Sequence, residues 1–200
     1  MRLLPALGSY DRDAGFLPHL RLRNLILEKT KADDEGLVLI ARPGLKTSFL
    51  VGSSPIAAIW TQSNVFGGDT ITLSGSTVYR NGASIGTLYA PASGPTRFAA
   101  IAGQLVFCNN GTLYRYDGTS LTTPALPNGM QVSSVAVLNN YFIAVQKGTQ
   151  RIYWSAIGDS NTWPALNFAE AESRPDALVD IVTLNDHLAM IGQESIEFWQ

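Results

Sequence analysis

Residues 97–118 decide the fold and read Arg97-Phe-Ala-Ala-Ile-Ala-Gly-Gln-Leu-Val-Phe-Cys-Asn-Asn-Gly-Thr-Leu-Tyr-Arg-Tyr-Asp-Gly118. An apolar strand leads to a turn at Gly103, and a second apolar strand leads to the dipeptide Asn110-Gly111. Asn-Gly is the preferred sequence of the type I′ turn that joins two antiparallel strands. A third strand then ends in aromatic residues. We therefore predict one antiparallel unit of three strands connected by tight turns.

The same order of features recurs further along the chain, in residues 133–155 and residues 178–199, and more weakly upstream in residues 56–88. The turn positions Gly103, Asn140 and Asp186 are 37 and 46 residues apart. These spacings bracket the ~40–50-residue period of four-stranded propeller blades. The predicted fold class is therefore all-β, with a propeller-like arrangement of antiparallel blades. A β-sandwich with irregular strands is the alternative.

The pattern also divides the chain. We expect an N-terminal arm over residues 1–20 and opening strands over residues 21–52, because apolar alternation begins near Leu20. Residues 53–200 then hold about three and a half propeller-like blades. The expected blade limits are residues 53–92, 96–127, 132–170 and 177–200.

Charge is scarce on this chain. Charged residues make up 15% of the sequence, against roughly 25% in a typical soluble domain, and the formal net charge is −2. Polarity comes instead from groups such as 16 Ser, 15 Thr and 11 Asn. Tight electrostatic binding of nucleic acid needs clustered Lys and Arg, so this composition excludes it. A charge-poor surface suits a chain that is partly covered by neighbours.

The sequence carries no constellation typical of catalysis, of a cofactor site or of a metal centre. Cys108 is the single cysteine, and His19 and His187 have no ligand spacing. The turn Gly67-Gly68-Asp69 lacks the Lys-Ser/Thr of a phosphate-binding loop. The carboxylates between residues 170 and 186 are interpreted as loop and edge residues that prevent wrong strand pairing. We predict no enzymatic activity, no cofactor and, since no apolar run approaches ~20 residues, no membrane span.

Short motifs follow one another in a fixed order. They are Asn24-Leu25, Leu27-Glu28, Arg42-Pro-Gly-Leu45, Tyr114-Arg-Tyr-Asp-Gly-Thr119, Asp159-Ser-Asn-Thr-Trp163, Phe168-Ala-Glu-Ala-Glu172, Pro175-Asp176 and residues 181–199. In this order they resemble the packaged-DNA stabilisation proteins of short-tailed bacteriophages, also called tail accessory, hub or nozzle proteins. Members of that family usually run to several hundred residues. The resemblance therefore implies either the N-terminal part of a larger propeller, whose closure lies beyond Gln200, or an unusually short relative.

The resemblance implies a structural virion protein of the phage tail, assembled in the host bacterial cytoplasm. It would form a ring, implied to be a hexamer, below the portal and its adaptor, next to other tail proteins. Double-stranded DNA would pass through the ring without sequence specificity, and the ring would help to retain the packaged genome. We interpret six residues as candidate structural or interface positions rather than catalytic ones. They are Trp154, Asp159, Trp163, Pro175, Asp176 and Trp199.

A second function stays open. Exposed tryptophans would suit a carbohydrate- or receptor-binding propeller at the phage tail, and Trp60, Trp154, Trp163 and Trp199 are the candidates. Three of these lie within or close after apolar strands, which favours packing in the core. A generic propeller scaffold is a third hypothesis.

Overall fold

The computed structural model describes residues 23, 25–29, 37–44, 46–47, 50–172, 174 and 176–200. The chain divides into two units, residues 1–48 and residues 49–200. The expected N-terminal arm over residues 1–20 lies outside the described residues, and so does Pro175.

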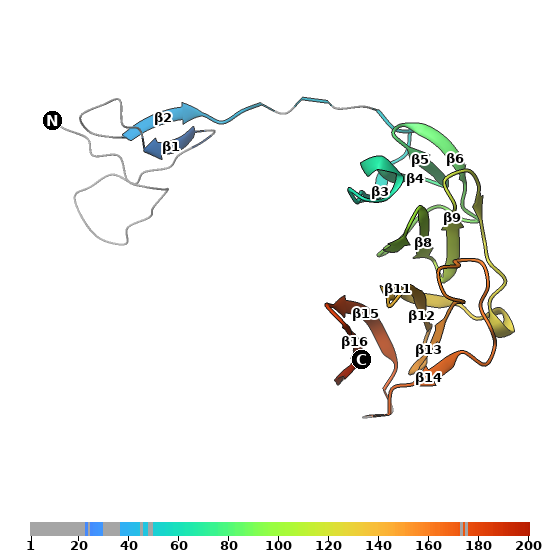
Figure 1. The fold of residues 1–200 in the computed structure, drawn as a ribbon. Helices are drawn as coiled ribbons and strands as arrows, with labels where there is room; N and C mark the ends of the chain where they lie inside the picture. The colour runs from blue at the N-terminus through green and yellow to red at the C-terminus, as the bar shows by residue number, and fades with distance from the viewer. Residues whose placement is uncertain are drawn as a thin grey trace. The chain divides into compact units, whose positions relative to one another are not determined.

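The first unit contains a two-stranded antiparallel sheet of β1 (Leu25–Lys29) and β2 (Leu37–Ala41) (Figure 1). In its register Ile26 lies opposite Ile40. The sheet leaves large apolar side chains exposed, which are Leu25, Ile26, Leu39 and Ile40. The side chains of the two strands alternate between the two faces of the sheet. No other described apolar side chain covers these four residues.

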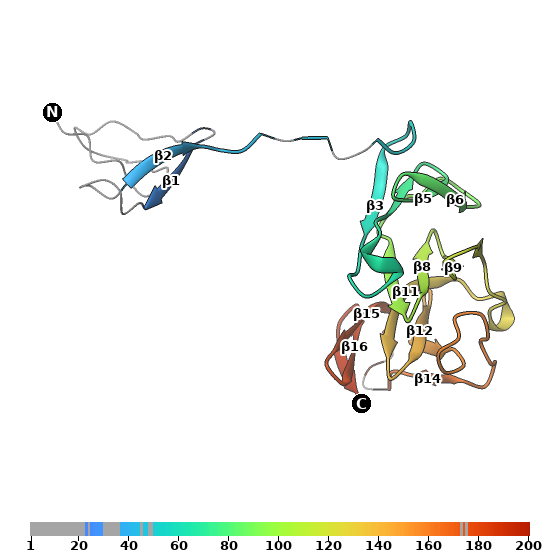
Figure 2. The same ribbon diagram turned by 45° about the horizontal axis from the view of Figure 1, so that its top comes forward.

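The second unit consists of four antiparallel sheets, which we name blades 1 to 4 and which follow one another in chain order (Figures 1 and 2). Blade 1 comprises β3 (Ile56–Trp60), β4 (Ile71–Ser74), β5 (Thr77–Arg80) and β6 (Ala83–Thr87). Blade 2 comprises β7 (Arg97–Ile101), β8 (Gln104–Asn109), β9 (Thr112–Tyr116) and β10 (Leu121–Thr122). Blade 3 comprises β11 (Val132–Leu138), β12 (Tyr141–Gln146), β13 (Arg151–Trp154) and β14 (Phe168–Glu170). Blade 4 comprises β15 (Leu178–Leu184), β16 (His187–Gly192) and β17 (Ile196–Trp199).

Each strand pairs with the next strand of its blade, and short turns join them. Asn110 and Gly111 have φ angles of 51° and 79°, and Asn139 and Asn140 have φ angles of 49° and 65°. Positive φ at both central residues is what a type I′ turn requires, and Asn and Gly tolerate it best. The predicted Asn-Gly hairpin turn is confirmed. Two short 3₁₀ turns, η1 (Phe66–Gly68) and η2 (Pro127–Gly129), interrupt the loops.

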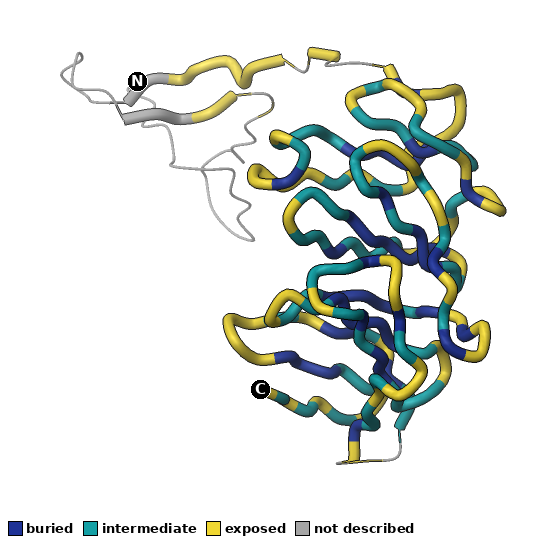
Figure 3. Tube along the Cα trace, turned by 45° about the vertical axis from the view of Figure 1, so that its right-hand side comes forward, coloured by how far each residue is buried: buried dark blue, intermediate teal, exposed yellow. Residues whose placement is uncertain are grey.

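Three apolar clusters lie between consecutive blades, and no blade has a core of its own. Since strand side chains alternate between the two faces, each central blade contributes one face to the cluster before it and the other face to the cluster after it. Figure 3 shows the buried residues along the central strands and the exposed residues at the turns. The clusters between blades 1 and 2, 2 and 3, and 3 and 4 include the buried residues Phe107, Phe142 and Leu188, respectively.

The observed architecture is therefore all-β and propeller-like, as the sequence predicts. In the described part of the chain, no helix is long and apolar enough to cross a membrane.

Candidate functional site

A hydrogen-bonded network joins the first strands of blades 2, 3 and 4, which lie side by side. Arg97 donates from Nε to Asp180 Oδ2 at 2.8 Å, and its Nη2 lies 2.6 Å from the same oxygen. Ser134 Oγ donates to Asp180 Oδ1, and the backbone N–H of Ile181 donates to Oδ1 at 3.0 Å. One carboxylate therefore connects three blades.

The charge of Asp180 is held in place by its partners. Burial by itself would raise the pKa of this carboxyl, but the hydrogen bonds from Arg97 and Ser134 outweigh it and lower the pKa below the usual value. Asp180 lies in β15, which is an edge strand of its sheet. It also pairs with a residue 83 positions earlier, a partner that no local sequence pattern reveals.

The loop between β13 and β14 carries two of the candidate residues. The carboxylate of Asp159 accepts the N–H of Asn161 at 2.8 Å, and the hydroxyl of Thr162 and this N–H lower its pKa. Trp163 is buried in the cluster between blades 2 and 3, and its Nε1 donates to the carbonyl of Ser160 at 3.0 Å. The aspartate therefore shapes the turn, and the indole fills the space between two blades.

The same loop is attached to blade 2 through Ser160, which is fully buried. Its N–H and Oγ both donate to Gln104 Oε1, at 3.0 and 2.6 Å, and Arg115 Nε donates to Ser160 Oγ at 3.1 Å. Gln104 Nε2 in turn donates to the carbonyl of Gly158 at 2.7 Å. Gln104 and Ser160 carry no recognisable signal in the sequence as a pair, because 56 residues separate them.

Asp176 lies apart from these residues, in the segment between β14 and β15. Its carboxylate contacts the turn between β16 and β17. It accepts the backbone N–H of Glu194 at 2.8 Å and the hydroxyl of Ser195 at 2.8 Å. These hydrogen bonds, first from the Glu194 backbone and then from the Ser195 side chain, lower the pKa of Asp176. The described contacts of Asp176 therefore stabilise the turn that joins β16 to β17.

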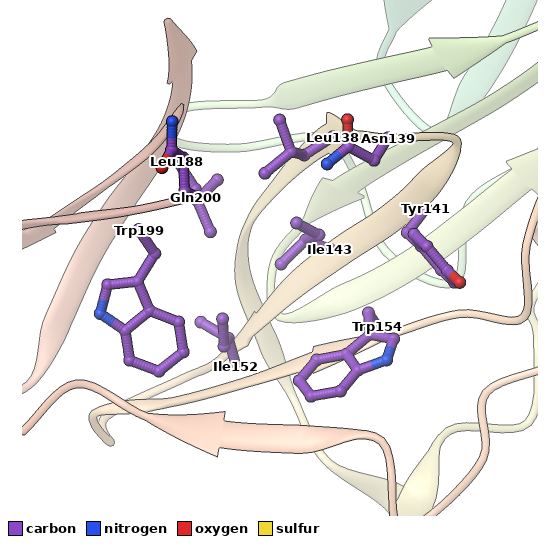
Figure 4. Close-up of a pocket in the computed structure, with 9 residues that line it drawn as sticks. All are labelled: Leu138, Asn139, Tyr141, Ile143, Ile152, Trp154, Leu188, Trp199 and Gln200. Atoms are coloured by element: carbon purple, nitrogen blue, oxygen red, sulfur yellow. The ribbon is translucent and has the colours of Figure 1, made fainter. Parts of the chain in front are cut away.

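Trp154 and Trp199 come together at a cavity of about 310 Å³ between blades 3 and 4. Figure 4 shows the two indoles on either side of Ile152. Both indoles are partly buried and pack against the cluster between these blades. The rim carries neutral polar groups from Asn139, Tyr141 and Gln200, and none of the described residues that line the cavity is charged. The arrangement suits an apolar or aromatic-stacking ligand.

Carboxylates close in space neutralise the arginines of the blades. Five arginines each have a carboxylate within 4.0 Å, in the pairs Arg80–Asp69, Arg97–Asp180, Arg115–Asp117, Arg151–Glu170 and Arg174–Glu194. Among the described residues from 50 onward, Lys147 is the one Lys or Arg side chain without such a partner. The described residues also contain no cluster of His, Cys, Asp and Glu that could hold a metal ion.

Cys108 is expected to be chemically inert in the folded protein. The residue is 2% exposed, its thiol lies 3.4 Å from the carbonyl of Ser133, and burial raises the pKa of the thiol to about 11. Since the thiolate is the reactive form, we expect a disulfide reagent at pH 8 to react at least about 100-fold more slowly with the native protein than with the denatured protein. Equal absorbance kinetics for both forms would contradict this prediction.

Comparisons with known proteins agree with this description. A family model described as "Bacteriophage P22 Gp10, beta-propeller" matches residues 7–200. No curated protein sequence matches the chain.

Solved structures share the fold at low sequence identity. The computationally designed Ika4 protein has a TM-score of 0.54 at 13% identity, covering 78% of this chain and 98% of Ika4. Kluyveromyces lactis Hsv2 has a TM-score of 0.51 at 14% identity, covering 94% of this chain and 62% of Hsv2. YCF48 bound to D1 peptide has a TM-score of 0.54 at 11% identity, covering 88% of this chain and 57% of YCF48. The chain therefore spans less than two thirds of the length of Hsv2 and of YCF48.

The structural matches show the propeller fold alone, whereas the family model covers nearly the whole chain. The antiparallel blades agree with the β-propeller that the family description names. The chain belongs to the family of the bacteriophage P22 Gp10 β-propeller, the phage stabilisation proteins, which are structural proteins of the phage tail.

Proposed function

We propose that this protein forms a ring in the phage tail, below the portal and its adaptor, and that double-stranded DNA passes through the ring. The observation that carries the proposal is the family membership together with the local neutralisation of charge. Residues 49–200 contain six Lys and Arg and ten Asp and Glu, a formal charge of −4. A duplex slides past such blades without the phosphate contacts that clustered free cations would make.

A ring of copies also accounts for the composition. Cyclic assemblies use head-to-tail interfaces, in which two different surfaces of the same chain meet. Interface cores are depleted in charged residues, and this chain is 15% charged. Retention of the packaged genome then follows from closure of the tail conduit, a mechanical role in which no side chain performs chemistry.

The test is the mass of the protein under native conditions, together with negative-stain images and the protein content of purified virions. We expect a ring of about six copies and incorporation into the tail. In a second measurement, duplex DNA at ~200 mM salt should not bind tightly, because few unpaired cations are available to release counterions. A protein that stays monomeric and is absent from virions, or that binds DNA tightly at this salt concentration, would overturn the proposal.

The cavity between Trp154 and Trp199 favours a second candidate function, carbohydrate binding. Indole faces stack on sugars, and the amides of Asn139 and Gln200 are neutral hydrogen-bonding groups at the rim. Titration of host-surface oligosaccharides against tryptophan fluorescence tests this candidate. A dissociation constant in the millimolar range or below, lost in Trp154→Ala, would support it over a purely structural role.

A further inference from the structure

A cavity of about 310 Å³ lies where blades 2 and 3 meet, and it is separate from the cavity between Trp154 and Trp199. It is found at the end of the blades where β8 and β12 end and where β7 and β11 begin. The backbone N–H of Val132 donates to the carbonyl of Gly111 at 2.9 Å and joins the two blades at this point. We name it the blade 2–3 cavity. Five polar residues line it, which are Ser93, Asn109, Asn110, Ser133 and Lys147.

A β-bulge gives two adjacent serines different surroundings at this cavity. The register of β11 and β12 shifts here, and the consecutive residues Ser133 and Ser134 lie opposite Val145 alone. Such a bulge changes the direction of the side chains on its strand. The hydroxyl of Ser134 donates to Asp180 in the network that joins three blades, whereas Ser133 lines the blade 2–3 cavity.

The hydroxyl of Ser133 is buried without a hydrogen-bond partner. Among the side chains that the structure describes, its Oγ is the one buried nitrogen or oxygen atom of this kind. Burying a hydroxyl without a partner is unfavourable, and nearly all buried polar groups of folded proteins are hydrogen-bonded. A polar group bound in the cavity would supply the missing partner.

The asparagine side chains of the cavity wall already use their oxygen atoms. Asn109 Oδ1 accepts the backbone N–H of Ser93 at 3.3 Å, and Asn110 Oδ1 accepts the hydroxyl of Ser93 at 2.5 Å. Asn110 Nδ2 donates to the carbonyl of Pro91 at 2.9 Å, which uses one of its two hydrogens. These bonds hold the wall in place, and the capacity that remains at Asn110 is that of a donor.

Lys147 brings a positive charge to the rim of the cavity. It directly follows β12 and is exposed, and no described carboxylate lies within 4.0 Å of it. Its backbone N–H donates to the carbonyl of Gln131 at 2.8 Å, which fixes the start of the side chain beside the cavity. None of the described residues that line the cavity is Asp or Glu. The cavity therefore combines unused donors with one positive charge.

We propose that the blade 2–3 cavity binds a phosphate group, with the ammonium of Lys147 and the hydroxyl of Ser133 as its donors. A phosphate carries several acceptor oxygens, so it can accept from both groups at once. Lysine binds phosphate as a point charge and needs no planar match. The group comes either from free phosphate or from the backbone of passing DNA, which share this chemistry. A site with one cation binds weakly, and the inference does not rest on the formation of a ring.

Titration of inorganic phosphate into the 200-residue protein, followed by phosphorus NMR, tests the proposal. We expect saturable binding with a dissociation constant in the millimolar range, weakened about tenfold or more by Lys147→Gln and by Ser133→Ala. Lys46→Gln is the matched control, because it removes the same charge from the first unit and Lys46 does not line the cavity. Circular dichroism verifies that each variant folds. Absence of saturable binding at about 50 mM phosphate, or equal binding by Lys147→Gln and the wild type, would overturn the proposal.

The stability of Ser133→Ala separates a binding role from a structural one. The substitution removes a buried hydroxyl that has no partner, so without phosphate the urea midpoint should stay unchanged or rise. A hydroxyl that serves only the packing of the fold gives the opposite pattern. A Ser133→Ala protein that is less stable and still binds phosphate like the wild type would remove Ser133 from the site.

Dimethyl phosphate distinguishes the two sources of the group, because it is a diester with the chemistry of the DNA backbone. If it competes with inorganic phosphate and a DNA duplex does so too, the cavity takes phosphates of passing DNA. If inorganic phosphate binds and neither diester competes, the ligand is free phosphate. Both results support the cavity as a phosphate site, and they differ in what it contacts in the tail.

Discussion

Trp163→Ala is expected to lower the free energy of unfolding by about 3–5 kcal/mol, the range for removing a large aromatic side chain from a core. Trp163 is 6% exposed, and it packs with residues of both blade 2 and blade 3, such as Val106 and Phe142. Its removal leaves a cavity and an unsatisfied carbonyl at Ser160, which accepts the indole N–H. Urea denaturation followed by circular dichroism measures the change.

The matched control for this prediction is Trp154→Ala. Trp154 is only partly buried and lines an open cavity between blades 3 and 4, so solvent can replace its contacts. We expect less than half the destabilisation of Trp163→Ala. A Trp163→Ala protein within 1 kcal/mol of the wild type would show that the loop between β13 and β14 does not support the packing of blades 2 and 3.

Asp180→Asn is expected to cost about 2 kcal/mol, because it removes the charge that pairs with Arg97 and leaves the guanidinium with weaker hydrogen bonds. This value is below the range for a fully buried pair, since the Arg97 side chain is 42% exposed and solvent screens part of the interaction. Glu170→Gln is the matched control. It removes the partner of Arg151 in a pair exposed on both sides, and we expect a smaller loss.

The same substitution changes the pH dependence of stability. The pKa of Asp180 in the folded protein lies below the ordinary 3.8, so the unfolded chain takes up the proton first as the pH falls. The stabilisation is therefore complete above the unfolded pKa and is lost as the pH falls below 3.8 through the folded pKa. Denaturation midpoints of wild type and Asp180→Asn should converge in this acidic range. A constant difference down to the lowest pH would contradict the assignment.

Strands with strong alternation and clear turns were predictable. The three-strand units expected in residues 97–118, 133–155 and 178–199 coincide, within two residues at each end, with β7 to β9, β11 to β13 and β15 to β17. The short outer strands β10 and β14 were not predicted, because two or three residues are too few for a period of two to be recognised. These two short strands form by hydrogen bonding to longer neighbours, since β10 pairs with β9 and β14 pairs with β13.

Some residues of the candidate site were also predictable from the sequence, and others were not. Asp159, Trp163 and Asp176 stand out in sequence because they lie in the motifs that resemble the phage tail family. Asp159 and Trp163 also have hydrogen-bond partners within three residues. The network of Arg97, Ser134 and Asp180 leaves no such signal, because it exists only once three blades lie next to one another.

The sequence by itself determined that this protein is built of antiparallel strands with hairpin turns, that its charge is low and that its motifs follow the order of a phage tail family. Alternation and turn chemistry are local, so they act before any long-range contact forms. Only the tertiary structure decided which faces meet and which arginine meets which carboxylate. The physical reason is that an apolar strand face looks the same in sequence whether a neighbouring blade covers it or not.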